Sequence, residues 1–325
     1  MRFFAALVCA LVTFGAAYAD TWRPAPGATE VPLWPDSAHI ARPDVTGPET
    51  AHPVDRAVGG RGWGYIENVT RPTMTIYPPH GANTGAAVMV FPGGGYNILA
   101  VDLEGTEVCD WLVSRGITCV LLKYRVPGGG PNWNRACNCR QIPRVPMALQ
   151  DAQRAMGLLR QRAMSLGVDP HKIGVIGFSA GGHLVAAVSN TRERTYARVD
   201  AADDLSSAPD FGMALYPGHL WANADNPDAA PHGDLTLASD IHVSAQTPPT
   251  FIVMAEDDHV DGVRMALAYY MALREVNAPV EMHLYATGGH AFGLRRTNEA
   301  ITEWPALAER WMQGLGVLPR NTSTP

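Results

Sequence analysis

The sequence predicts an α/β fold in which a mostly parallel central sheet is covered by helices on both faces. Short, continuously apolar segments alternate with longer segments whose apolar residues recur every three to four positions. Strands that are apolar on both faces and separated by helices are typical of parallel sheets. The length of 325 residues and the hydrophobic content of 46% suffice for one large core of this kind.

The individual elements follow from these patterns. Runs of apolar and β-branched residues predict strands at residues 73–77, 87–91, 118–124, 172–178, 211–216, 250–255 and 280–285. A first helix contains Val108 and Leu112 and ends at Gly116, a residue type favoured just after a helix. Further helices are predicted at residues 148–166, 180–190, 263–273 and 304–315. Most of these helices lie between two strands, as the crossovers of a parallel sheet require.

The N-terminus has the features of a signal peptide over residues 1–19. Arg2 precedes an apolar run that is too short to span a bilayer comfortably, and Ala17-Tyr18-Ala19 matches a cleavage site. We therefore expect a secreted or periplasmic protein that begins at Asp20, with no membrane association in its mature form.

Two further segments complete the expected organisation. Residues 20–62 are rich in proline, glycine and alanine without any period, which predicts an irregular N-terminal arm. Residues 63–318 form the predicted catalytic domain, with no large cap. Its two long loops, residues 127–146 and 217–248, exceed ordinary connections, and such loops are often functional.

Four cysteines remain after the predicted cleavage. An even number in an exported chain permits two disulfides with three possible connectivities. Alternatively, the cysteines in apolar surroundings are simply buried small residues. A zinc site is less favoured because the C-x-C pair has no second pair at ligand spacing. The cysteines are Cys109, Cys119, Cys137 and Cys139.

The composition argues against several partners and cofactors. The net charge of −6 is spread along the chain, and no cluster of basic residues with interleaved aromatics is present, so no nucleic-acid partner is expected. The sequence contains neither a P-loop nor a dinucleotide-binding glycine pattern. We therefore expect no organic cofactor and no metal.

A G-x-S-x-G motif, Gly177-Phe178-Ser179-Ala180-Gly181, lies between a predicted strand and a predicted helix. Here the pattern predicts a tight, strained turn that lifts the serine hydroxyl out of the sheet. The backbone N–H of Ala180 would lie at a helix N-terminus, where a developing oxyanion is stabilised. We therefore predict Ser179 as a nucleophile; the alternative is a simple helix N-cap.

A serine nucleophile needs a base, and the base needs an orienting acid. In α/β hydrolases the chain order is serine, acid, histidine. His290 follows the strand at 280–285 in a glycine-rich turn and is the predicted base. The acid should follow the strand at 250–255. The position of the strand end favours Asp258, with Asp257 as the alternative.

Three glycines follow the strand at 87–91 in the segment Pro92-Gly93-Gly94-Gly95-Tyr96. Their position corresponds to the oxyanion-hole segment of lipases and esterases. We predict that the backbone N–H groups of Gly94, Gly95 and Ala180 stabilise an oxyanion, and that Tyr96 contacts substrate.

These motifs together resemble one bacterial branch of the α/β hydrolases, the bifunctional feruloyl/acetyl-xylan esterase-like family, close to the hormone-sensitive-lipase-like esterases. The resemblance covers about residues 65–315 and departs from the family pattern at Ala291, where the family has glycine. It implies an α/β-hydrolase fold without a large cap and a hydrolase that removes acyl groups, often from plant polysaccharide. The segments that carry it are residues 68–72, 92–96, 99–105, 124–127, 149–155, 177–183 and 288–290.

The sequence therefore predicts a serine carboxylesterase that hydrolyses small acyl esters, acetyl or hydroxycinnamoyl, on a small molecule or on a polysaccharide such as xylan. Trp133 and Trp221 stand among polar residues in the two long loops, a composition typical of a sugar-contacting rim or of ordinary solvated loops. Three alternatives stay open: a serine peptidase, a lipase, and a non-catalytic binding protein of the same fold.

Overall fold

The computed structural model describes residues 21–45, 47–128, 133–134, 139–140, 146–224, 228 and 230–320. The predicted signal peptide, with its cleavage site after Ala19, and Cys137 lie outside the described residues. In the described part of the chain, no helix is long and apolar enough to cross a membrane.

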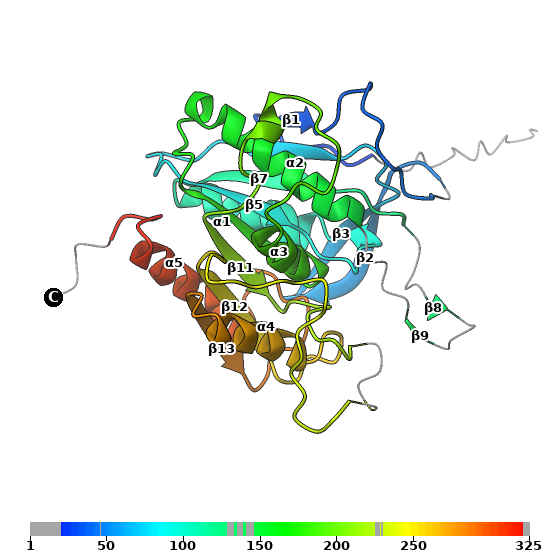
Figure 1. Cartoon of the computed structure of the whole chain (residues 1–325), viewed down its shortest axis with the longest axis vertical. Helices are drawn as coiled ribbons and strands as arrows, with labels where there is room; N and C mark the ends of the chain where they lie inside the picture. Colours follow the sequence, from blue (N-terminus) through cyan, green and yellow to red (C-terminus); the bar gives the residue numbers. More distant parts are fainter. Residues whose placement is uncertain are drawn as a thin grey trace, which may run out of the picture.

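Eight strands of the described chain form the central sheet, in the order β1-β4-β7-β5-β10-β11-β12-β13 (Figure 1). The strands from β7 to β13 in this order are parallel, whereas β1 and β4 are antiparallel at one edge. The predicted mostly parallel sheet is therefore confirmed. The strands are β1 (Thr29–Pro32), β4 (Thr73–Tyr77), β5 (Ala87–Phe91), β7 (Thr118–Lys123), β10 (Ile173–Phe178), β11 (Phe211–Leu215), β12 (Thr250–Ala255) and β13 (Val280–Tyr285).

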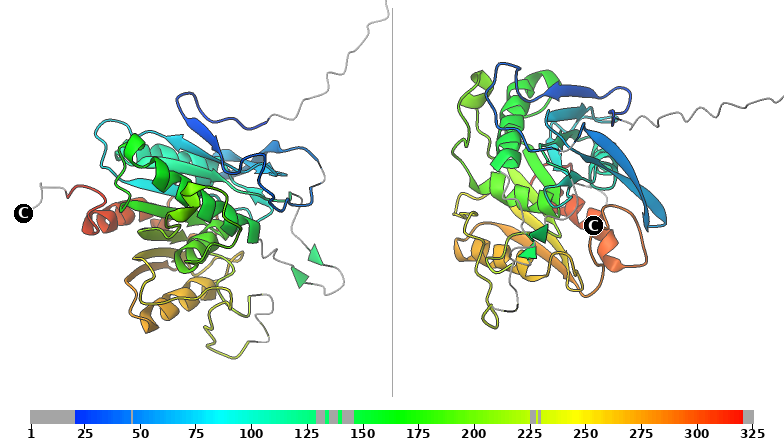
Figure 2. Two further views of the ribbon diagram at one scale, coloured as in Figure 1. Left: turned by 45° about the horizontal axis from the view of Figure 1, so that its top comes forward. Right: turned by 90° about the vertical axis from the view of Figure 1, so that its right-hand side faces the viewer.

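Helices cover both faces of this sheet. The right-hand view of Figure 2 has α2 and α3 on one side of the sheet and α5 on the other. α1 lies with α5, because Trp111 packs edge-on against Trp304 with ring centroids 5.4 Å apart. The long helices are α1 (Glu107–Ser114), α2 (Pro146–Arg162), α3 (Ala180–Asn190), α4 (Arg264–Glu275) and α5 (Trp304–Gly314). Short helical turns are η1 (Asp102–Thr106), η2 (Met164–Leu166), η3 (Ala201–Asp204) and η5 (Ala300–Glu303).

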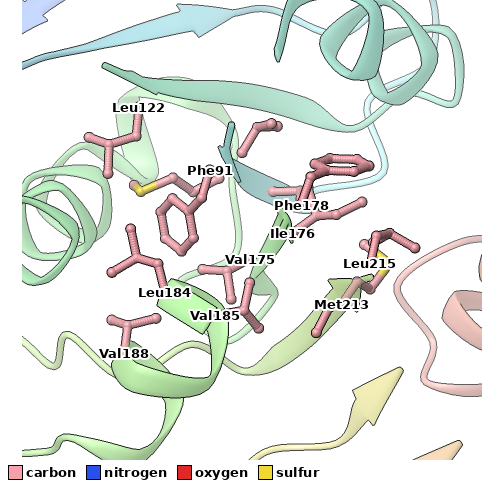
Figure 3. Packing of buried hydrophobic residues seen from close by; sticks show 14 of the residues in the cluster. Phe91, Leu122, Val175, Ile176, Phe178, Leu184, Val185, Val188, Met213 and Leu215 are labelled. Atoms are coloured by element: carbon pink, nitrogen blue, oxygen red, sulfur yellow. The ribbon is translucent and has the colours of Figure 1, made fainter. Parts of the chain in front are cut away.

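The core beneath the site consists of interlocking apolar side chains from the sheet and α3 (Figure 3). Phe91, Phe178 and Leu215 occupy the carboxyl ends of three neighbouring strands and are fully buried. Leu184 and Val188 of α3 are buried in the same cluster. This packing fixes the start of α3 directly after the end of β10, which is where Ser179 lies.

The expectation of an irregular arm over residues 20–62 is wrong in part. This segment contains β1 at the sheet edge and most of a separate antiparallel sheet, built from β2 (Thr50–Val58), β3 (Arg61–Glu67) and β6 (Ile98–Leu99). Gly59 and Gly60 connect β2 and β3 with φ angles of 55° and 76°. Two consecutive positive φ angles define the two-residue type I′ turn that suits a hairpin. The Gly-Gly pair was therefore the local signal for this hairpin.

The cysteines fall into two groups. Cys109 of α1 and Cys119 of β7 are joined in the structure, with Cα atoms 5.2 Å apart. The disulfide in the protein itself stays a prediction, as does the export that would favour it. Cys139 lies in a short two-stranded sheet of β8 (Trp133–Asn134) and β9 (Cys139–Arg140), whose side chains lie outside the described part.

Candidate active site

The turn between β10 and α3 holds Ser179 in an unusual backbone conformation. Its φ of 53° and ψ of −119° lie outside the regions that non-glycine residues ordinarily adopt. Such strain persists only where surrounding packing enforces it, and it is frequent at functional sites. Gly181 allows the close approach, because a Cβ at this position would collide with the carbonyl oxygen of Phe91.

Two further loops bring a histidine and a carboxylate to this serine. His290, after β13, has its Nε2 3.0 Å from Ser179 Oγ and its Nδ1 2.7 Å from Asp258 Oδ2. Asp258 comes from the loop after β12 and is 3% exposed. The three residues are far apart in the chain but converge because β10, β12 and β13 are parallel, so that their carboxyl ends share one edge of the sheet.

The loop after β12 presents two neighbouring aspartates in different directions. Asp258 Oδ1 accepts hydrogen bonds from the backbone N–H groups of Val260 and Asp261, so its other oxygen faces His290. Asp257 Oδ1 instead accepts from the backbone N–H of Gly289 at 2.8 Å. The geometry thus favours Asp258 as the partner of the imidazole and gives Asp257 a role in holding the His290 turn.

The pKa of His290 is raised above its ordinary value of 6.5. Burial by itself lowers it, but the hydrogen bond that the ring donates to Asp258 and the charges of Asp261, Asp258 and Glu104 outweigh the burial. Because a general base must be neutral to accept a proton, this shift moves the active form of His290 toward higher pH.

The glycine segment after β5 approaches the same point. Gly94 has a φ of 131°, and a Cβ there would collide with the Ile98 carbonyl, so the loop requires glycine at this position. The backbone N–H of Gly93 donates to Glu104 Oε2 at 2.8 Å, so Gly93 is engaged in the scaffold, and the oxyanion role of Gly94 and Gly95 stays a prediction. Ala180 is the first residue of α3, where N–H groups point outward along the helix axis.

The sequence reasoning missed Glu104, which is 2% exposed and lies beneath this loop. Its carboxylate also accepts a hydrogen bond from Tyr216 Oη at 2.8 Å, and the Tyr216 ring packs against His290 with centroids 4.9 Å apart. Burial raises the pKa of Glu104, although its hydrogen bonds and the charge of His290 oppose the shift. Glu104 therefore links the glycine segment after β5 to His290 through Tyr216. No local pattern indicates this role, because Glu104 of η1 meets Tyr216, which follows β11, only in the folded chain.

A second carboxylate near the nucleophile was also missed. Asp261 is 6% exposed, and its Oδ2 accepts a hydrogen bond from Ser179 Oγ at 3.1 Å. The same oxygen lies 3.8 Å from Nε2 of His290. Its carboxylate packs closely over Gly218, where a Cβ would come within 2.7 Å of both carboxylate oxygens. The three-residue spacing from Asp258 could have drawn attention to it.

The aromatic residues that were predicted to contact substrate lie in different surroundings. Tyr96 follows directly after Gly95. Its side chain is buried, and its hydroxyl lies 2.7 Å from Nδ1 of His183. The prediction of an exposed rim at Trp221 is wrong, since its side chain is 4% exposed, its Nε1 donates to Asp234, and Arg264 covers the ring. Trp221 is thus held by Asp234 of the same loop and by Arg264 of α4. The side chain of Trp133 lies outside the described part.

Among the described residues, no group of three or more His, Cys, Asp or Glu side chains is arranged so that it could hold a metal ion. The chemistry of the site as described consists of a hydroxyl, an imidazole, three carboxylates and backbone N–H donors.

Comparison with known proteins identifies the family. The model of the prolyl oligopeptidase family matches residues 103–315, more than half of the chain. The chain belongs to the prolyl oligopeptidase family. Members of this family share the α/β-hydrolase fold, so the predicted fold is confirmed. Proteins similar to this chain are named as esterases and hydrolases.

The relatives also confirm the resemblance to acetyl-xylan esterase-like hydrolases. An acetylxylan esterase of Xylanibacter ruminicola is 28% identical over 224 residues, which cover 65% of this chain and 42% of that enzyme. The chain thus spans about two fifths of the length of this relative. The crystal structure of an acetyl ester-xyloside bifunctional hydrolase from Caldicellulosiruptor lactoaceticus is 31% identical, with a TM-score of 0.68, and the match covers 89% of this chain and 97% of that one.

A more distant structure agrees in fold alone. A butyrate-bound esterase from Thermogutta terrifontis is 22% identical, with a TM-score of 0.60, over 78% of this chain and 93% of that one.

Proposed function

We propose that this chain is a serine carboxylesterase. The observation that carries the proposal is the continuous hydrogen-bonded chain from Ser179 Oγ through His290 to Asp258, anchored on a strained turn. Such an arrangement activates a serine hydroxyl for attack on a carbonyl carbon.

The proposed reaction has two halves. Ser179 Oγ attacks the ester carbonyl while its proton passes to Nε2 of His290, and Asp258 stabilises the resulting imidazolium. The N–H groups of Gly94, Gly95 and Ala180 receive the oxyanion. The bond to the alcohol then breaks as His290 protonates the leaving oxygen. Water attacks the acyl-enzyme by the same route and restores Ser179.

We propose small acyl groups, acetyl or hydroxycinnamoyl, on a carbohydrate such as xylan as the substrate. The names of the two xylan-related relatives support this choice, and so does the predicted signal peptide, because polymeric carbohydrate lies outside the cytoplasm. The burial of Trp221 removes one of the two tryptophans on which the predicted sugar rim depended. The substrate proposal therefore depends on the relatives rather than on that rim.

A peptidase is the second candidate, and the name of the family model favours it. The similar proteins named above favour an esterase instead. Purified protein should therefore hydrolyse p-nitrophenyl acetate and release acetate from acetylated xylan, and leave a proline-containing peptide uncut. Long-chain p-nitrophenyl esters test a lipase, and a fluorophosphonate probe, which labels active serines, tests a non-catalytic binding protein.

The decisive variant is Ser179→Ala. It should lower kcat for p-nitrophenyl acetate by about 10⁴- to 10⁶-fold while the circular dichroism spectrum stays unchanged. Ser189→Ala in the same helix is the matched control, because this buried hydroxyl has no hydrogen-bond partner among the described residues, and it should retain activity and labelling. Retention of more than a few per cent of activity in Ser179→Ala would refute the assignment.

A further inference from the structure

The serine hydroxyl has two acceptors within reach but only one proton. Ser179 Oγ lies 3.1 Å from Asp261 Oδ2 and 3.0 Å from Nε2 of His290. A hydroxyl donates one hydrogen bond, so the serine proton points to Asp261 or to His290 and never to both. Attack on an ester requires the proton to point to His290. In the arrangement described here, Asp261 therefore competes with the base for the nucleophile.

We propose that Asp261 is the binding subsite for a hydroxyl group adjacent to the scissile ester, so that the enzyme prefers monoesters of vicinal diols over simple alkyl esters. This inference rests on the proposed esterase function. When such a hydroxyl donates to Oδ2 of Asp261, it competes with Ser179 Oγ for that oxygen and so favours the orientation in which the Ser179 proton points to His290. A substrate with this second hydroxyl thus favours the hydrogen bond from Ser179 to His290 that attack on the ester requires.

The distances around His290 fit this assignment. The leaving oxygen must come within hydrogen-bond reach of Nε2 of His290 to be protonated. Asp261 Oδ2 lies 3.8 Å from the same nitrogen. The leaving oxygen of the ester and Oδ2 of Asp261 would therefore both lie close to Nε2 of His290. The two oxygens of a gauche vicinal diol are separated by about one hydrogen-bond length, so the second hydroxyl can reach Asp261 while the first leaves.

The surroundings of Asp261 hold it as a fixed acceptor. Its backbone N–H donates to Asp258 Oδ1 at 3.0 Å, which ties it to the loop of the proposed triad acid. The close approach of Gly218 restricts the carboxylate from the other side. The charged groups that face His290 are Asp258, Asp261 and Glu104, and the Tyr216 ring packs against it. A pre-positioned carboxylate is a strong acceptor for a substrate hydroxyl.

A matched pair of esters tests the proposal. 2-Hydroxyethyl acetate and propyl acetate have alcohol groups of nearly equal size and differ only in a terminal hydroxyl or methyl. Wild-type protein should show a kcat/KM about tenfold to a hundredfold higher for the hydroxy ester, the range expected for a hydrogen bond to a charged group. Asp261→Val removes the acceptor and should bring this ratio close to one.

Asp261→Asn provides a second, nearly isosteric variant that keeps one acceptor oxygen and loses the charge. It should retain part of the preference. It should also move the acid limb of kcat/KM to lower pH for both esters, since the Asp261 charge raises the pKa of His290. Glu256→Gln, an exposed carboxylate in the same loop, is the control and should change neither the ratio nor the limb.

Equal kcat/KM for the two esters in the wild-type protein overturns the proposal, as does a preference that survives in both Asp261 variants. A role of Asp261 in packing or in activating water would lower both rates together and leave the ratio unchanged, which also counts against it. Failure of the wild-type protein to hydrolyse either ester refutes the proposed esterase function instead, so the two failures are distinguishable.

Discussion

Two groups of buried charges in this protein differ in how they are balanced. The scaffold cluster pairs two guanidinium groups with two carboxylates, and consists of Arg125, Asp151, Arg154 and Asp203. The active-site cluster surrounds one imidazole with three carboxylates, and consists of His290, Glu104, Asp258 and Asp261. Both are largely excluded from solvent, yet in the first each buried carboxylate lies against a guanidinium group, and Arg154 also pairs with the partly exposed Asp200 at 2.6 Å.

The scaffold cluster fastens the N-terminal segment to the core. Arg125 contacts both oxygens of Asp151, and Trp34 from the N-terminal segment donates to the same carboxylate at 2.7 Å. Arg154 binds Asp203 and donates to the carbonyl of Leu33 at 3.0 Å. Each charge has an opposite charge and further hydrogen bonds, which is the condition under which a buried ion pair is tolerated.

The active-site cluster lacks such neutralisation. Its excess of carboxylates raises the pKa of His290 despite the burial that opposes protonation. The comparison indicates that buried charges in the scaffold are arranged for structure, whereas those around Ser179 are arranged to set a protonation state. Substitutions in the two clusters should therefore have different consequences.

The largest expected effect is on catalysis. Asp258→Asn should lower kcat for p-nitrophenyl acetate by about 10⁴-fold, because an amide favours the wrong imidazole tautomer and cannot stabilise the imidazolium. Asp257→Asn should cost about tenfold or less, since its amide oxygen can still accept from Gly289. Neither variant should lose much stability. The opposite order of damage would move the acid to Asp257.

A large effect on stability is expected in the scaffold cluster. Arg125→Met leaves Asp151 buried without its cation and should lower the free energy of unfolding by about 3–5 kcal/mol in urea titrations. The kcat of the folded fraction should stay unchanged. Arg198→Met removes an exposed pair with Asp204 and is the control, with no measurable loss expected. If Arg125→Met lowered kcat without lowering stability, the scaffold cluster would not have the purely structural role assigned to it.

The smallest expected effect is a change in pH dependence. The charge of Glu104 raises the pKa of His290, so Glu104→Gln should lower that pKa and move the acid limb of kcat/KM to lower pH. The Tyr216 hydroxyl can turn to accept from the new amide, which limits the structural damage. Asp204→Asn, an exposed carboxylate, should leave the limb in place. An unmoved limb in Glu104→Gln would show that Asp258 and Asp261 alone set this pKa.

The sequence by itself determined the parts of this protein that depend on neighbouring residues. Strand and helix periods predicted the parallel sheet, because burial of a face repeats with the local geometry of each element. The spacing of glycines around Ser179 predicted the turn after β10, since that turn needs residues without Cβ where the Phe91 carbonyl approaches. The turn that carries His290 followed from its position after a predicted strand.

The tertiary structure decided which groups those elements bring together. The hydrogen bonds from Val260 and Asp261 orient the two oxygens of Asp258, and no residue count distinguishes that aspartate from Asp257 with certainty. Glu104 of η1 joins the site only through contacts with distant segments, such as its hydrogen bond from Tyr216, which follows β11. Trp221 is buried in the core and contacts both Asp234 and Arg264 of α4. Side-chain direction and burial depend on contacts between distant segments, and those contacts exist only in the folded chain.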